Sequence, residues 1–441
     1  MTLEEAIAAA LRNNLRLAQE DLTVQQRELD VEQAKSEFEA TYGPFVQVAA
    51  PDGQPQTAYG LQVSKPFSLG TTVGVSTTVL SDQKQDGATL AVELTQPLFR
   101  RFGREATEEP IHAGADQLRA ARRLWEIRKA DLVLSIVSLF ETITRFDAQA
   151  EFEKQFCIRM EQLSTLTRTR ERQGRATRMD TLRVDLQQGE AEIRQTNVRE
   201  RRAMAARELA EAIGADVRQE ISLIPPPLLD ATLPEPEAAI AAALIHRMDI
   251  AQVLDDEVVA GRRESIANRT RWPDITLGLS LLQKYKTGLE ESADGEETAW
   301  FASASADGYP WKRSDRLLRS EAKLERQSAR TRIEIARKTL VREVLQALAE
   351  CRRTEVDLVI AGRNRELAIQ AARLGRRFYT TGRADGLSMS DAESQLATAE
   401  IRLLETRSAA RFSRYALTYT LGTLIEHPAD LIPVQGKEGS P

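Results

Sequence analysis

The chain has 441 residues, of which 42% are apolar, 29% charged and only 5% aromatic, and its formal net charge is −6. This length is enough for one large core or two ordinary ones, and few aromatics beside abundant Ala, Leu, Arg and Glu favour long helices over a thick globular core. The negative balance argues against general binding to a nucleic-acid phosphate backbone, so no nucleic-acid partner is expected.

The chain opens with a segment that occurs twice. The hexapeptide AIAAAL stands at 6–11 and again at 239–244, and both copies run on in step to an Ala-Gln pair at 18–19 and 251–252. The first copy leads into a predicted helix over about 16–42. Because similar elements follow both copies, the sequence predicts two internal structural repeats.

Strand patterns follow each opening helix. In TTVGVSTTV and ATLAVELTQPLF, within 57–99, apolar residues alternate with small or polar ones, which is typical of half-buried strands. The polar stretch SDQKQDG at 81–87 is predicted to be the loop between them. Alternation returns from Ile275 to Leu281, an acidic loop follows at 289–297, and strand sequence is expected over about 274–310. About four strands per chain are therefore predicted.

A long helical hairpin is predicted after each strand region. Residues 111–213 and 312–424 are rich in charge and helical periodicity and free of proline. Glycines interrupt each run near its middle, Gly174 in the first and Gly382 with Gly386 in the second, and glycine is the usual residue at a helix end. The helix from about 111 to 173 would measure roughly 95 Å. Its apolar residues nearly surround it around 132–143, which favours a closed ring of helices over a two-helix coil.

These elements define the expected organisation. Residues 1–230 form the first repeat, 231–425 the second and 426–441 a C-terminal tail. The predicted fold class is mainly α with a small β part. No run of about 18 apolar residues exists, so no membrane-spanning helix is expected, and no basic-then-apolar leader precedes Thr2.

The predicted strands have one apolar and one small or polar face, which leaves two interpretations open. Several chains could share one transmembrane barrel, with apolar residues towards lipid and strand-end aromatics such as Tyr59, Tyr285, Trp300, Tyr309 and Trp311 at the interfaces. A small soluble sheet packed on helices is the alternative. Open sheet edges favour closure, because unpaired edges invite aggregation.

At this point the sequence resembles the TolC-like outer-membrane efflux protein family along essentially its whole length. The resemblance rests on the two AIAAAL openings, on LTQPLFRRFGR at 94–104, and on the hairpin tips QGRATRMDTL and YTTGRADGLSMSDAESQLATAE. It implies a homotrimer whose protomers each give four strands to a shared twelve-stranded barrel in the bacterial outer membrane, with an α-helical barrel extending into the periplasm. It also implies outer-membrane lipid as surroundings, and a periplasmic adaptor (membrane fusion) protein and an inner-membrane transporter as partners in efflux or type I secretion.

The resemblance assigns a closed periplasmic entrance to the hairpin tips. A tyrosine and an aspartate that hold the family's entrance shut correspond to Tyr379 and Asp180, although a carboxylate at 180 also suits the first turn of a helix, and both roles stay open. The family's two aperture aspartates correspond to Ser388 and Asp391, so only one carboxylate would remain beside Arg383. The tips and adaptor-docking surface correspond to Gly174, Arg175, Ala176, Thr177, Gly382, Ala384, Gly386 and Leu387.

The tips are also basic, with six arginines between 168 and 183 and four between 373 and 383. Many are expected to be solvated or paired with Glu171, Asp180 and Asp385, and others could meet acidic groups on an adaptor. We therefore expect weaker cation selectivity than two aspartates would give.

An enzyme is not expected. His112, His246 and His427 are isolated, and the sequence contains no phosphate loop, nucleophile elbow or ligand cluster. Cys157 and Cys351 match no metal-ligand spacing and are interpreted as buried apolar residues, so no cofactor or metal is predicted. The alternative to a channel is a soluble or periplasmic coiled-coil scaffold or adaptor. The cargo and the partner transporter are not encoded in any motif.

Overall fold

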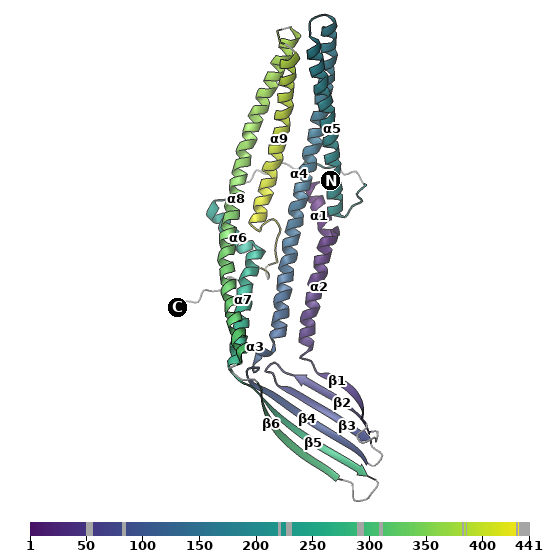
Figure 1. Cartoon of the computed structure of the whole chain (residues 1–441), viewed down its shortest axis with the longest axis vertical. Coiled ribbons are helices and arrows are strands. Elements are labelled where there is room, and N and C mark those ends of the chain that lie inside the picture. Colours follow the sequence, from purple (N-terminus) through teal and green to yellow (C-terminus); the bar gives the residue numbers. More distant parts are fainter. Residues whose placement is uncertain are drawn as a thin grey trace. The chain divides into compact units, whose positions relative to one another are not determined.

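The computed structural model describes residues 1–49, 56–81, 85–218, 222–225, 232–288, 295–307, 312–381, 383–384, 386–428 and 431. The first half of the chain contains α1 (Leu3–Asn13), α2 (Leu15–Ser36), β1 (Thr41–Ala49), β2 (Gln56–Pro66), β3 (Thr72–Ser81), β4 (Gln85–Phe99), α3 (Arg104–Thr107), α4 (Glu109–Arg172) and α5 (Arg178–Ile213). The second half contains α6 (Pro236–His246), α7 (Met248–Asn268), the short 3₁₀ helix η2 (Arg269–Arg271), β5 (Asp274–Gly288), β6 (Gly295–Asp307), α8 (Arg313–Thr380) and α9 (Gly386–Thr420). The mainly α fold with a small β part is confirmed, as are the two long hairpins (Figure 1).

The chain divides into two compact units, each built from both halves of the sequence. The helical unit comprises Met1–Asp21, Arg123–Ala251 and Ala336–Pro441, and the sheet unit comprises Leu22–Arg122 and Gln252–Ile335. The predicted repeats at 1–230 and 231–425 are therefore not separate compact bodies, although α1 and α6 do begin the two halves with the same hexapeptide.

The strand count expected from the sequence, four, is wrong. One antiparallel sheet holds six strands in chain order, β1 to β6, and four of them belong to the first half. Two predicted element boundaries also differ from the observed ones. The helix predicted over 16–42 ends at Ser36, because strand β1 begins at Thr41, and the loop predicted at 81–87 is shorter, because β4 begins at Gln85. β1 was missed since Gly43 and Pro44 interrupt its alternation.

The register puts apolar side chains of all six strands on one face of the sheet. Directly paired residues share a face, and rows such as Tyr42↔Val63, Val63↔Val75, Val75↔Val92, Val92↔Leu281 and Leu281↔Trp300 run across it. The opposite face is mostly small or polar, as in the row Thr41↔Ser64, Ser64↔Gly74, Gly74↔Glu93 and Glu93↔Ser280, which ends at the aromatic Phe301 of β6. The apolar face is open to solvent in the single chain: Trp300 is 73% exposed. The predicted strand-end aromatics Tyr309 and Trp311 lie outside the described residues.

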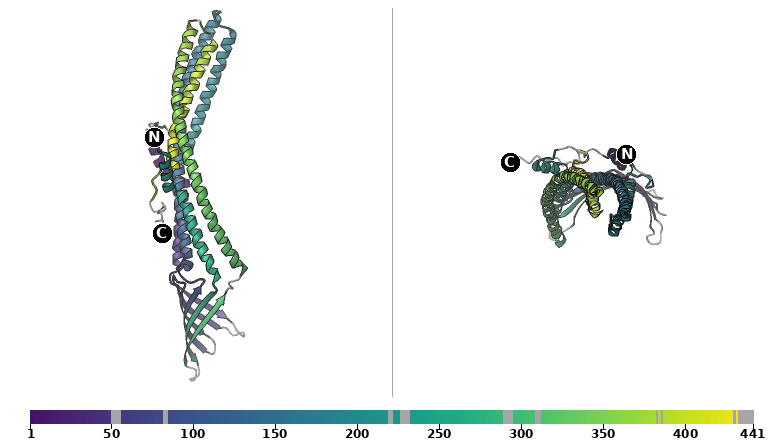
Figure 2. Two further views of the ribbon diagram at one scale, coloured as in Figure 1. Left: turned by 90° about the vertical axis from the view of Figure 1, so that its left-hand side faces the viewer. Right: turned by 90° about the horizontal axis from the view of Figure 1, so that it is seen from above.

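The helices of the sheet unit lie side by side in the same order as the strands to which they connect in the chain. α2 contacts α4, where Gly114 lies against Val31 and Arg122 pairs with Glu28 at 2.7 Å. α4 contacts α7 through Arg262, which binds Glu109 at 2.8 Å and Asp116. α7 contacts α8 through Arg326, which binds Glu257 at 3.1 Å and Glu264 at 3.0 Å. The order α2–α4–α7–α8 therefore leaves α2 and α8 at the two edges of this unit (Figure 1). Figure 2 draws the same ribbon from the side and from above.

In the helical unit the small residues of α1 allow close packing. Ala6 and Ala10 are buried with Ile136, Val137 and Phe140 of α4 and with Leu209 of α5. The equivalent positions of the second copy, Ala239 and Ala243, are buried as well. A buried ion pair ties α9 to α4, since Arg411 donates two hydrogen bonds to Glu141, at 3.0 and 2.7 Å.

Within the described part of the chain, no helix combines the length and the apolar character that crossing a bilayer requires.

Candidate functional site

The candidate site is the pair of hairpin tips in the helical unit. At the first tip, α4 ends in a glycine-terminated turn: Gly174 adopts φ +68°, and the Arg175 amide donates to the carbonyl of Arg170 at 2.8 Å. α5 then starts with a capping box. The Thr177 hydroxyl accepts from the Asp180 amide at 3.2 Å, and the Asp180 carboxylate accepts from the Thr177 amide at 2.9 Å. Local hydrogen bonds therefore close this basic turn, as its glycine and its Thr-x-x-Asp pattern predict.

At the second tip, α8 ends at Thr380 and α9 starts at Gly386. The Arg383 amide donates to the Phe378 carbonyl at 2.8 Å, which closes the end of α8. Ala384 is half-buried and Leu387 is partly buried, whereas Arg383 is exposed. Gly382 and Asp385, which the sequence also placed at this tip, lie outside the described residues.

Tyr379 joins the two hairpins. Its side chain is 2% exposed, and its hydroxyl lies 2.9 Å from the hydroxyl of Thr167 on α4. The Thr167 hydroxyl already donates to the Leu163 carbonyl at 2.8 Å, so Tyr379 is the donor in this pair. Tyr379 belongs to a buried hydrophobic cluster that also contains Phe156, Met160, Leu163 and Val184. A hydroxyl buried in this way must keep its partner, because an unpaired buried donor costs about 1–3 kcal/mol.

Arg170 reinforces the same contact. Its guanidinium carbon lies 4.1 Å from the centre of the Tyr379 ring, and its nitrogens donate to the carbonyls of Tyr379 at 2.7 Å and Thr380 at 3.2 Å. Those carbonyls end α8 and have no partner within the helix, so a cation is favoured there. Arg170 therefore caps α8 from α4. Neither Arg170 nor Thr167 was assigned a role from the sequence, although their three-residue spacing puts them on one face of α4.

Gly386 brings the two predicted latch residues towards each other. A Cβ at this glycine would lie 3.6 Å from the Asp180 Cβ and 3.8 Å from the Tyr379 ring. In this arrangement the Tyr379 hydroxyl contacts Thr167, and the Asp180 carboxylate serves the capping box. Asp180 thus fills the capping role that the sequence left open, and the Tyr379–Asp180 latch remains a prediction.

The predicted aperture residues Ser388 and Asp391 lie in the first turns of α9, three residues apart, and both are exposed. At the first tip Arg175 is exposed and Ala176 is half-buried. Some of the basic residues pair as expected, although not always with the expected partner. Arg178 lies 3.6 Å from Glu171, Arg168 lies 3.0 Å from Asp185, and Arg376 binds Glu393.

Buried charges lie further along the helices of the same hairpins. Glu393 is 1% exposed and accepts from Arg159 at 3.0 Å as well as from Arg376. Glu153 is also buried, with Arg194 at 3.5 Å and no hydrogen-bond partner for either carboxylate oxygen among the described residues. Burial raises the pKa of Glu153, and Arg194 opposes that shift only in part. Burial likewise raises the pKa of Glu400 against the nearby Arg159 and Arg365. Such groups favour the protonated form.

His427 and Cys351, which the sequence also singled out, each make a contact in the helical unit. Over the residues that the structure describes, no group of three or more His, Cys, Asp and Glu side chains is placed to hold a metal ion. His427 contacts Glu126 at 3.2 Å in a buried pair, which is a structural contact between the C-terminal segment and α4. Cys351 is buried and donates to the Ser413 carbonyl at 3.2 Å. The contacts of Tyr379 and Arg170 at the tips hold the two hairpins together.

Neither a protein-family model nor a curated protein matches the chain. Solved structures do match it in fold. The outer-membrane channel OprN superposes with a TM-score of 0.75 at 15% identity, covering 96% of this chain and 90% of that one. The outer-membrane protein VceC from Vibrio cholerae gives 0.73 at 16% identity, covering 95% and 96%. The Campylobacter jejuni outer-membrane channel CmeC gives 0.73 at 11% identity, covering 97% and 87%. The chain therefore has the fold of these channels.

Proposed function

We propose that three copies of this chain form an outer-membrane channel with a tunnel reaching into the periplasm. The channel is the passive exit duct of a tripartite efflux pump or a type I secretion system. An inner-membrane transporter supplies the energy, and a periplasmic adaptor joins it to the hairpin tips. The shared fold with outer-membrane channels supports this proposal.

The observation that carries the proposal is the continuous apolar face of the sheet. All six strands present alternating apolar residues on that face, and several are large and exposed, such as Leu279 at 49% and Trp300 at 73%. A soluble sheet would cover such a face, because exposed apolar patches of this extent are rare. Lipid covers it without any further protein. The opposite face, with Glu93 and Ser280, suits a water-filled lumen.

The tips supply the entrance to this duct. The Tyr379–Thr167 bond and the Arg170 cap connect the two hairpins of one chain through a small number of polar contacts. Contacts of this kind can separate and re-form as a unit, which is what a two-state gate requires. Adaptor docking at Gly174, Arg175 and their neighbours is part of the same proposal, because these residues are exposed at the turn.

Membrane extraction tests the proposal. The chain is produced with a secretory leader in a bacterium that has an outer membrane, and the membranes are washed with salt and carbonate before detergent is added. We expect the protein only in the detergent extract, with the mass of three chains by light scattering, and ion conductance when it is reconstituted into planar bilayers. Copurification of an adaptor and a transporter from native membranes identifies the system it serves.

The competing function is a soluble or periplasmic helical scaffold. A monomer released without detergent, with no conductance after reconstitution, would establish that alternative and exclude the channel. Two hairpins in one chain, beside a single sheet whose apolar face is uncovered, weigh against the scaffold.

A further inference from the structure

The two outermost strands of the sheet lack a second neighbour. Within the described part of the chain, β1 pairs only with β2, and β6 pairs only with β5. Backbone amides and carbonyls along such an edge would be unsatisfied in lipid, where each unpaired group costs several kcal/mol. Because the proposed function places this sheet in a membrane, both edges need partners.

We propose that β6 of one chain pairs with β1 of the next, so that three chains close one barrel of eighteen strands rather than twelve. The inference rests on the proposed trimeric channel and adds its strand number and its seam. Three chains contribute six strands each. The partner at each edge is a second copy of this chain, because β1 leaves the end of α2 and β6 returns to the start of α8, so the two edges run antiparallel when copies stand side by side.

The register supports closure with an ordinary strand tilt. The row of directly paired residues that begins at Thr41 reaches Phe301 on β6, six residues before the last residue of β6, Asp307. If Thr41 of one copy pairs directly with Asp307 of the next, the register shifts by six residues over six strands. At about 3.3 Å per residue and about 4.8 Å between strands, the tilt is about 35°, within the range that closed barrels adopt.

The same register keeps the two faces continuous across the seam. An even shift pairs Val46 with Ala302 and Val48 with Trp300, all on the apolar face. Pairs of a small and a larger residue suit neighbouring strands. Pro44 removes at most one amide donor from this edge, and proline is tolerated at such positions.

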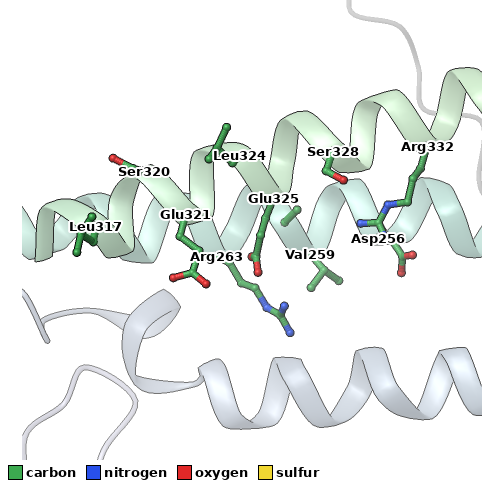
Figure 3. A pocket seen from close by; sticks show the side chains of 11 residues that line it. Asp256, Val259, Arg263, Leu317, Ser320, Glu321, Leu324, Glu325, Ser328 and Arg332 are labelled. Atoms are coloured by element: carbon green, nitrogen blue, oxygen red, sulfur yellow. The ribbon is translucent and has the colours of Figure 1, made fainter. Parts of the chain in front are cut away.

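A second observation places the same seam between helices. α2 carries three exposed leucines at seven-residue spacing, Leu15, Leu22 and Leu29, of which Leu22 is 57% exposed and Leu29 63%. On α8, Leu317 and Leu324 are exposed with the same spacing, beside the groove between α7 and α8 (Figure 3). A stripe of this period is what a neighbouring helix buries. Since α2 precedes β1 and α8 follows β6, the leucine stripes flank the strand edges that the proposal joins.

Closure with eighteen strands widens the exit. At the same tilt and spacing the strands would lie about 17 Å from the barrel axis, against about 11 Å for twelve strands. Barrels of 16–18 strands enclose an aqueous channel. The sheet therefore does not form the narrowest part of the duct, and control of passage falls to the tips.

Disulfide trapping in membranes tests the seam. Val46→Cys is combined with Ala302→Cys, and separately with Ala304→Cys for the next even register. Oxidation is expected to give reducible dimers and trimers with at least one pair. The matched control combines Val46→Cys with Phe301→Cys, whose side chains lie on opposite faces, and the single variants control for Cys157 and Cys351. Electron cryo-microscopy of the unmodified trimer counts the strands directly.

The outcomes separate the two proposals. A detergent-extracted trimer with eighteen strands and cross-links at the seam supports both. A trimer that conducts ions but shows another strand number and no cross-link in either register overturns the eighteen-strand barrel and leaves the channel function intact. A soluble monomer overturns the channel, and with it the seam.

Discussion

The hydroxyl of Tyr379, near the end of α8, lies 2.9 Å from the hydroxyl of Thr167 on α4, and both side chains are buried. This contact joins hairpins that are more than two hundred residues apart in the sequence. It fixes the last turn of α8 at the proposed entrance, so changes at either residue are expected to alter opening.

Thr167→Val removes the acceptor and leaves the Tyr379 hydroxyl buried without a partner. We expect the free energy that holds the end of α8 against α4 to fall by about 1–3 kcal/mol. The open probability in planar-bilayer recordings should therefore rise. Adding Tyr379→Phe removes the unsatisfied hydroxyl, so the double variant should open less often than Thr167→Val alone. Equal opening in the wild type and Thr167→Val would show that this bond does not hold the entrance.

Substitutions of Arg170 test the cap on α8. Lysine keeps the charge but loses the planar group that stacks on Tyr379 and donates to two carbonyls. Alanine loses the charge, the stacking contact and both hydrogen bonds. Proteolysis of the tip should therefore accelerate in the order wild type, Arg170→Lys, Arg170→Ala. Arg172→Ala, at an exposed neighbouring arginine, is the matched control and should behave as wild type. If Arg170→Lys resists proteolysis as well as the wild type does, only the positive charge of Arg170 stabilises the end of α8.

Ser388→Asp introduces a second carboxylate three residues before Asp391, at the proposed entrance. Two rings of carboxylates attract cations more strongly than one, so the reversal potential in a salt gradient should shift towards the cation equilibrium value. Ser388→Asn, similar in size and uncharged, is the control. An unchanged cation preference after Ser388→Asp would place these residues away from the narrow part of the entrance.

The buried carboxyl of Glu153 should make the hairpins less stable as pH rises. Its pKa in the folded chain is raised by burial above the usual value near 4.5, so the folded state holds a proton that the unfolded state has released. Unfolding stability therefore falls as pH rises through the folded pKa, and no difference remains well below pH 4.5. Glu153→Gln should raise the melting temperature at pH 7–8 and leave it unchanged near pH 4.

Circular dichroism in detergent measures that effect. Glu200→Gln, at an exposed carboxylate on α5, is the control and should show little change at either pH. A Glu153→Gln variant that is less stable than wild type at pH 8 would mean that the Arg194 interaction outweighs burial.

The Arg411–Glu141 pair gives a test of buried charge in the helical unit. Arg411→Ala leaves Glu141 buried without its cation and should cost about 3–5 kcal/mol, seen as a lower melting temperature. Arg411→Met with Glu141→Leu removes both charges and should come close to wild-type stability. A double variant as unstable as Arg411→Ala would indicate that the pair stabilises the fold beyond its own desolvation cost.

Local sequence patterns were enough to predict the long hairpins, the glycine turn at Gly174 and the apolar alternation of most strands. These features depend on local periodicity and on single residues such as Gly174, whose conformational preferences act over a few positions. At the start of α5 only the favourable position of the Asp180 carboxylate in the first turn was predicted; the capping box with Thr177 is a finding of the structure.

The strand count and the partners of the tip residues depend instead on contacts between distant parts of the chain. β1 is interrupted by Gly43 and Pro44, and it becomes a strand through its pairing with β2. Thr167 and Arg170 gain their roles because folding brings α8 against α4, and no pattern within α4 specifies which distant tyrosine they meet. Local propensity fixes where helices and strands form, whereas contacts between residues far apart in sequence depend on how those elements pack.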